Sequence, residues 1–175
     1  VGSAGFSTSD GFINSLFVYN GTPYVACGSN AVNTTVMKYD SSIWSNVGTV
    51  GSAYSLSLSV YNGTPYVAYQ DGNNNQEVSV KKYENSSWVN VGPAGFSAGI
   101  ANNVTLSIYN GTPYVAYSDF GVSLGKAAVM KYNGSAWENV GTIGFSAGEA
   151  YYTSLAVYNG TPYVACGSNA VNTTV

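Results

Sequence analysis

Short runs of apolar and β-branched residues, each closed by a turn, make up the whole chain. In its first part these runs cover residues 15–19, 23–28, 34–39 and 43–47. Asn-Gly follows the first run, and because this dipeptide tolerates positive φ at both turn positions, it indicates a tight hairpin. No stretch combines the 3.6-residue period of an amphipathic helix with helix caps. The pattern therefore predicts four short strands per unit and almost no helix.

The same pattern recurs along the chain. The string Tyr-Asn-Gly-Thr-Pro-Tyr-Val-Ala begins at Tyr19, Tyr61, Tyr109 and Tyr158, at intervals of 42, 48 and 49 residues. Trp-x-Asn-Val-Gly and the linker Gly-Phe-Ser each occur three times. These repeats predict four units, the last of them incomplete. The expected units cover approximately residues 3–48, 49–92, 93–141 and 142–175.

A four-stranded meander at this spacing predicts an all-β fold, a β-propeller made of four-stranded antiparallel blades. Only 7% of the residues are charged, which suits blades that cover one another's faces. Three complete blades plus a half blade do not close a ring, since propellers have about four to eight blades. We therefore expect another chain, or residues outside this segment, to close it. Self-association is the expected partnership, with a dimer as its simplest form.

Two segments of the chain are identical. Val18–Val36 matches Val157–Val175 over 19 residues, whereas the middle units differ from them at many positions. An identity of this kind beside diverged copies indicates either a recent duplication of a three-unit block or deliberate engineering.

The position of the tryptophans resembles a known type of repeat. A Trp opens the fourth strand after a tight turn, as at Asp40 to Trp44, and this is similar to β-propeller repeats of the kelch and Asp-box kinds. The resemblance covers the whole chain and implies the fold. Asp40 stands four residues before the Trp, where the Asp-box pattern has five, and the double glycine of kelch strands is missing. The resemblance therefore implies no active site.

Charge and composition exclude several functions. The net charge is −3, and the five positive charges are all Lys, so no basic face for nucleic acid is expected. No apolar run approaches the roughly 20 residues that span a bilayer, so membrane insertion is not expected. Without His, a Ser-His-Asp triad is excluded, and the two cysteines are too few for a zinc site. We predict no cofactor, metal or catalytic residue. The abundance of Asn, Ser, Thr, Gly and Tyr is typical of a secreted or cell-surface protein.

The loops between the second and third strands carry the predicted ligand site. Ser29, Asp71 and Asp119 follow the second strand at equivalent positions of their units, so we expect them on one rim of the ring. Tyr, Trp, Asn and Asp stack on sugars and hydrogen-bond to them, and lectin propellers are similar in this respect. The expected ligand is a glycan. The predicted contacts are Ser29, Asn30, Asp71, Asn73 and Asp119.

Two functions follow from this reading of the sequence. The first is a non-enzymatic propeller that binds a glycan through pockets on the rim or between blades. The alternative is a structural or assembly unit of a surface protein, or an engineered or duplicated fragment, without a specific ligand. An enzyme is not expected, because nothing in the sequence pairs a base with a nucleophile.

Overall fold

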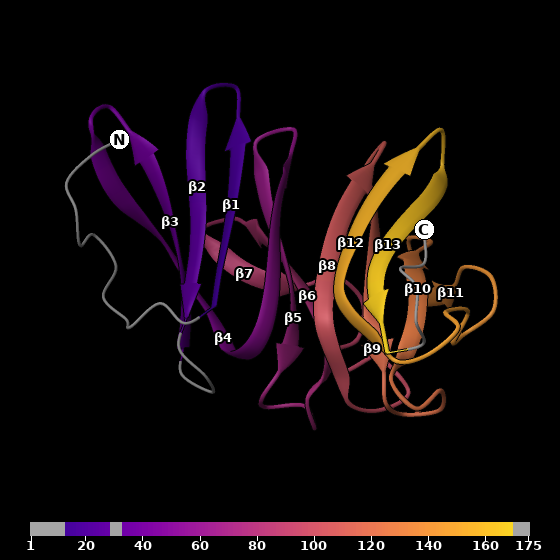
Figure 1. Ribbon diagram of the computed structural model, residues 1–175. Helices are drawn as coiled ribbons and strands as arrows, with labels where there is room; N and C mark the ends of the chain where they lie inside the picture. The colour runs from indigo at the N-terminus through magenta and orange to yellow at the C-terminus, as the bar shows by residue number, and fades with distance from the viewer. Residues whose placement is uncertain (1–12, 29–32, 170–175) are drawn as a thin grey trace.

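The computed structural model describes residues 13–28 and 33–169, and every regular element within these ranges is a β-strand (Figure 1). The strands are β1 (Ile13–Tyr19), β2 (Thr22–Gly28), β3 (Asn33–Asp40), β4 (Ile43–Tyr61), β5 (Thr64–Asp71), β6 (Glu77–Glu84), β7 (Ser87–Asn90), β8 (Ala101–Tyr109), β9 (Thr112–Asp119), β10 (Lys126–Tyr132), β11 (Trp137–Asn139), β12 (Ala150–Tyr158) and β13 (Thr161–Ser168).

Each strand pairs antiparallel with the next strand of its sheet. The first blade consists of β1 to β4, the second of β4 to β7 and the third of β8 to β11, and β12 with β13 forms a hairpin. Figure 1 shows these sheets side by side, from indigo β1 to yellow β13. The innermost strands are β1, the second half of β4, β8 and β12. The prediction of an all-β fold with four-stranded antiparallel blades is confirmed.

One strand differs from the prediction. The fourth strand was expected to end before Gly48, but β4 continues for 19 residues and pairs with β3 in its first half and β5 in its second. The link between these blades lacks Gly-Phe-Ser and is short, so no irregular segment separates them. Gly48 and Gly51, with φ of 125° and 145°, redirect the strand from one sheet to the next. The expected unit boundary at 48/49 falls within β4, and the unit boundaries stay a prediction.

Buried apolar side chains gather between blades, and we call each such interface a seam. The seam between the first and second blades buries Val47, Val50, Leu58, Val67 and Tyr69. The seam between the second and third blades buries Val80, Val91, Leu106, Val115, Tyr117 and Trp137. A smaller cluster between the third blade and the last hairpin buries Ala116, Val129 and Val164. The blades are therefore stabilised mainly by their neighbours.

Hydroxyl groups join the inner strands across the seams. The Leu58 amide donates to Ser15 Oγ at 2.9 Å, and the Leu106 amide donates to Ser57 Oγ at 3.1 Å. An inner strand has one edge without a partner strand, and these hydroxyls satisfy amides at that edge. The same repeat position holds Ser15, Ser57, Thr105 and Ser154, each followed by Leu.

The Trp-x-Asn-Val-Gly motifs of successive units meet across a seam. Trp137 Nε1 donates to the Val91 carbonyl at 2.7 Å, and its ring stacks on Phe96 with centroids 4.1 Å apart. A Cβ on Gly92 would lie 3.1 Å from Trp137 Nε1 and 2.8 Å from the Tyr132 ring. The glycine is therefore required for this close approach as well as for its φ of 76°.

The linker motif Gly-Phe-Ser replaces the rest of the fourth strand. Ser97 Oγ accepts the Val78 amide at 2.9 Å and donates to the Gly99 carbonyl at 2.8 Å. Ser146 Oγ accepts the Ala127 amide at 2.9 Å in the same way. Both serines are buried. The hydroxyl thus satisfies a third-strand amide where the short β7 or β11 has ended.

Candidate functional site

The inner strands are irregular near their first residues, and this positions polar side chains at one end of the blades. Pairing register shifts between Ala53 and Leu56, between Asn102 and Thr105, and between Tyr151 and Ser154. Asn103 and Tyr152, within the last two irregularities, have φ of 52° and 51°. A β-bulge changes the direction in which side chains point, and bulges are frequent beside active sites.

A cavity of about 510 Å³ opens where these strand ends meet, and we call it the axial cavity. Side chains from three blades and the last hairpin surround it. They comprise four amides, three aromatic rings, one carboxylate, one hydroxyl and one leucine. The lining residues are Asn14, Tyr54, Ser55, Leu56, Gln70, Asn102, Asn103, Phe120, Glu149 and Tyr151.

Glu149 is the carboxylate on this cavity. The Tyr151 hydroxyl hydrogen-bonds to it, and this bond is the main reason why the pKa of Tyr151 is raised. The Glu149 amide donates to Asn169 Oδ1 at 3.0 Å, which holds the backbone. A Cβ on buried Gly125 would lie only 2.7 Å from Glu149 Cγ, so the glycine leaves the room that this side chain occupies. Glu149 is half-buried and is held at both its backbone and its carboxylate.

The amides of the cavity are fixed across the blades. Gln70 Nε2 donates to Asn102 Oδ1 at 2.9 Å and so joins the second blade to the third. Asn103 Nδ2 donates to Ser118 Oγ at 3.0 Å, and the Asn103 carbonyl accepts the Thr153 hydroxyl of the last hairpin. Hydrogen bonds therefore set the orientation of Gln70, Asn102 and Asn103 in the cavity wall before any ligand arrives.

Asp71 and Asp119 lie at this same end of the blades, with their carboxylates turned inward. Both are buried. Asp71 Oδ2 accepts the Ser79 hydroxyl at 2.7 Å and Oδ1 accepts the Asn73 amide at 3.0 Å, while Asp119 Oδ1 accepts the Gly121 amide at 3.0 Å. Both carboxylates thus hold the loops that follow β5 and β9. Their role as ligand contacts stays a prediction.

Asp71, Asn73 and Asp119 do not line the axial cavity. Asn73 is exposed in the loop after β5, and Ser29 and Asn30 lie outside the described residues. The residues beside two of the predicted acids do line it, namely Gln70 and Phe120. Adjacent residues of a strand point to opposite faces, which is why Gln70 lines the cavity and Asp71 does not. The predicted ligand contacts stay a prediction.

Two grooves lie between blades at the opposite end of the sheets. The larger, of about 650 Å³, separates the second and third blades, and Tyr66, Lys82 and Tyr132 are part of its lining. The smaller, of about 280 Å³, has Tyr24 and Lys38 at the equivalent positions between the first two blades. Neither groove is lined by a carboxylate. The axial cavity is therefore the stronger candidate for acid–base chemistry.

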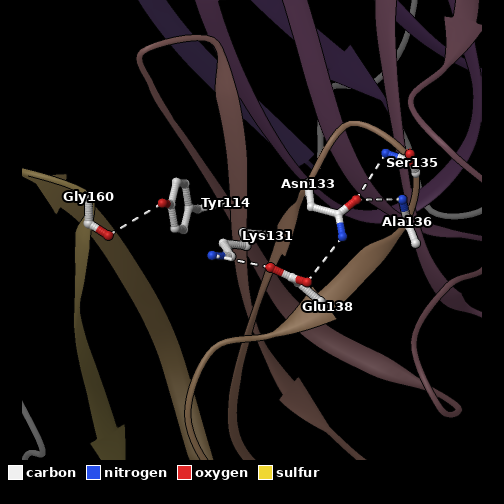
Figure 2. A network of polar contacts seen from close by, with 7 residues as sticks. All are labelled: Tyr114, Lys131, Asn133, Ser135, Ala136, Glu138 and Gly160. Atoms are coloured by element: carbon white, nitrogen blue, oxygen red, sulfur yellow. Dashed lines mark hydrogen bonds and ion pairs between the residues drawn. The ribbon is translucent and has the colours of Figure 1, made fainter.

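Figure 2 shows the hydrogen bonds and the ion pair that polar groups form near this opposite end. The Tyr114 hydroxyl donates to the Gly160 carbonyl at 3.3 Å. Lys131 Nζ lies 3.2 Å from Glu138 Oε1, and Asn133 Nδ2 donates to Glu138 Oε2 at 3.1 Å. The bond to Lys131 is the main cause that lowers the pKa of the Glu138 carboxyl. These contacts join the hairpin of β10 and β11 and connect Tyr114 to the last hairpin.

The described residues contain neither a cluster of metal ligands nor a membrane-spanning helix. Over residues 13–28 and 33–169, no three His, Cys, Asp or Glu side chains come together as a metal site. Cys27 and Cys166 are both buried and belong to different sheets. In the same part of the chain no helix is long and apolar enough to cross a membrane.

Comparison with known proteins gives matches in structure alone. Neither a protein-family model nor a curated protein sequence matches the chain. Its fold is similar to that of Bacteroides ovatus Xyloglucan PUL GH43B, with a TM-score of 0.58 and 15% identity over 87% of this chain and 35% of that one. A xylan β-1,4-xylosidase from Bacillus halodurans matches with a TM-score of 0.52 and 17% identity over 90% of this chain and 38% of that one.

A third similar structure is Zg3597, a family 117 glycoside hydrolase of the marine bacterium Zobellia galactanivorans. It has a TM-score of 0.51 and 13% identity over 92% of this chain and 67% of that one. This chain spans little more than a third of the length of the first two proteins. The matches bear out a partial β-propeller of antiparallel blades.

The same matches correct the predicted function. A non-enzymatic module, whether it binds a glycan or only assembles, is contradicted because these structural relatives are glycoside hydrolases. The prediction that the chain is not an enzyme is wrong for the same reason. No carboxylate pair stood out in the sequence, because Glu149 lies in a linker position that holds uncharged Ser52 and Ile100 in the second and third units and Asp10 in the first.

Proposed function

We propose that the chain is the propeller part of an enzyme that cleaves a glycosidic bond in a substrate held in the axial cavity. Tyr54, Phe120 and Tyr151 offer aromatic faces, and fixed amides surround them. Such faces pack against sugar rings, and amides hydrogen-bond to sugar hydroxyls. The observation that carries the proposal is the single half-buried carboxylate, Glu149, placed among these groups.

Glu149 is assigned the acid–base role. Glycoside hydrolysis uses two carboxyl groups, about 5 to 10 Å apart, one of which protonates the leaving oxygen. In the axial cavity as described, Glu149 supplies one of them, and its partner would come from outside the described residues. Tyr151 holds the Glu149 carboxylate by a hydrogen bond. The Glu149 side chain is therefore oriented in the cavity before the substrate binds.

The finer resemblance to kelch or Asp-box repeats stays a prediction, because the similar structures reported are glycoside hydrolases of other families. A secreted or cell-surface location also stays a prediction, and it rests on composition alone.

The proposal is tested with 4-nitrophenyl β-xyloside, since one structural relative is a xylosidase. Wild-type protein should release nitrophenolate above the uncatalysed rate. Glu149→Gln keeps the shape of the side chain but removes the acid, so kcat should fall by about 100-fold or more. If wild-type protein releases no product from this or other aryl glycosides, the proposed function is wrong.

The matched control is Glu138→Gln. Glu138 is exposed near the opposite end of the blades and pairs with Lys131. Its substitution should leave kcat unchanged. If Glu149→Gln retains the wild-type rate while the substrate is cleaved, the acid–base role of Glu149 is contradicted.

A further inference from the structure

The two kinds of blade face that meet in a seam are both also exposed, one on the first blade and one on the last hairpin. Each blade has a face that packs on the following blade and a face that receives the preceding one. We call these the outgoing and incoming faces. Two of these faces have no blade against them among the described residues. They are the outgoing face of the last hairpin, with Ser154 and Tyr163, and the incoming face of the first blade, with Leu16 and Val18.

The incoming face is apolar at positions that internal seams bury. Leu16 is 64% exposed, whereas Leu58, at the same repeat position, is 4% exposed. Val18 is exposed, whereas Val60 is buried. No charged side chain occupies these positions. The face therefore has the chemistry of a seam half.

The outgoing face shows the complementary pattern. Tyr163 is 54% exposed, whereas Tyr114, at the same repeat position, is 6% exposed and donates to the carbonyl of Gly160 in the next sheet. Ser154 is exposed, whereas the equivalent Ser57 accepts the Leu106 amide of the following blade. This face therefore presents an acceptor and a donor of the kind that internal seams use.

We infer that a second copy of this chain docks head to tail, with the outgoing face of one copy against the incoming face of the other. Such a contact would continue the row of seams that the chain already forms. In the new seam, the Leu16 amide would donate to Ser154 Oγ of the other copy, as the Leu58 amide does to Ser15. The β12–β13 hairpin also repeats a sequence of the first blade whose outgoing face already packs on a second blade. This inference stands apart from the proposed enzymatic function.

Two single variants test the two faces by sedimentation velocity across a concentration series of the full chain. Wild-type protein should change from 18.2 kDa to twice that mass as concentration rises. Leu16→Asp and Tyr163→Asp should each weaken association by about 100-fold or more, because each places a charge in an apolar seam. Since both residues are exposed in the single chain, the variants should fold, and near-ultraviolet circular dichroism checks this.

Mixing the variants tests the head-to-tail geometry. Leu16→Asp leaves the outgoing face intact, and Tyr163→Asp leaves the incoming face intact, so the mixture should associate where neither variant alone does. Leu124→Asp is the matched control, because this leucine is 87% exposed in a loop of the third blade and its substitution should not change association. A wild-type chain that stays monomeric, variants that associate normally, or a mixture that stays monomeric would each overturn the inference.

Discussion

Leu58 and Leu16 hold the same position in two repeats, but one is buried and the other is exposed. Leu58 is buried between two blades and its amide donates to Ser15, whereas Leu16 is exposed at the end of the blade row. The same contrast separates Phe96, which stacks on Trp137, from Phe145, which is exposed beside the last hairpin. Equivalent repeat positions thus hold the same residue type, and the presence of a neighbouring blade decides whether its side chain is buried.

This contrast indicates that packing between blades stabilises the chain. A single sheet of this kind buries little apolar surface alone, and its two faces become buried when blades stack. The buried clusters accordingly lie in seams, and within residues 13–28 and 33–169 no blade covers the outer face of the first or the last sheet. Substitutions at equivalent repeat positions therefore measure the seam directly, because sequence and local geometry are matched.

The largest expected difference is between Leu58→Ala and Leu16→Ala. Loss of the buried side chain should lower the free energy of unfolding by about 2 to 5 kcal/mol, through lost burial and the cavity left behind. The exposed position should change it by about 0.5 kcal/mol or less. Urea unfolding of dilute, monomeric protein provides the measurement. Equal losses at both positions would contradict the assignment of stability to the seams.

A smaller difference is expected between Gly92→Ala and Gly141→Ala. The two glycines are equivalent in the repeat and have φ of 76° and 74°, so both substitutions incur a similar backbone strain. A Cβ on Gly92 would meet Tyr132 and Trp137, whereas one on Gly141 would meet no atom within 4 Å. Gly92→Ala should therefore cost about 1 to 3 kcal/mol more. Thermal and urea unfolding of both variants provide the measurement. An equal loss in the free energy of unfolding would contradict the idea that Trp137 requires a glycine at position 92.

The smallest expected effect concerns pH. Burial, followed by the nearby Asp71 and Asp119 carboxylates, raises the pKa of Tyr69 and Tyr117 well above the usual value. The folded state then keeps a proton that the unfolded state loses, so stability is complete below pH ~10 and falls above it. The expected fall is about 1 kcal/mol per tyrosine between pH 10 and 11.

The control for this effect is Tyr117→Phe. Its hydroxyl donates to Met130 Sδ at 3.3 Å, so its removal should be tolerated at neutral pH. The variant should show a shallower loss of stability in alkaline urea titrations. An unchanged dependence of stability on pH would mean that ionisation of Tyr117 does not cause the alkaline loss of stability.

Much of the fold could be predicted from the sequence, because turns and repeats are local signals. The hairpins were predicted from the Asn-Gly dipeptides, and the structure shows the expected positive φ, for example 47° at Asn62. The continuous β4 was missed, because Gly48 has the local propensity of a strand end. The short link after it, which lacks Gly-Phe-Ser, was the signal that the strand continues.

The candidate site was harder to predict. Asp71 and Asp119 look like surface acids in the sequence, yet each accepts hydrogen bonds within its own loop. Glu149 precedes an inner strand at a position whose residue varies between units, and only the arrangement of the blades brings it into one cavity with Gln70 and Asn102. Variation at this linker position between units is the signal that could have pointed to it.

The account rests on seams that join neighbouring inner strands, and amide hydrogen exchange observed by NMR tests them most directly. In dilute monomeric protein, the Leu58 and Leu106 amides should exchange about 100-fold or more slowly than the Leu16 amide. Ser15 and Ser57 accept the first two, whereas no blade in the part of the chain that the structure describes precedes the third. Similar exchange rates at all three amides would contradict the account.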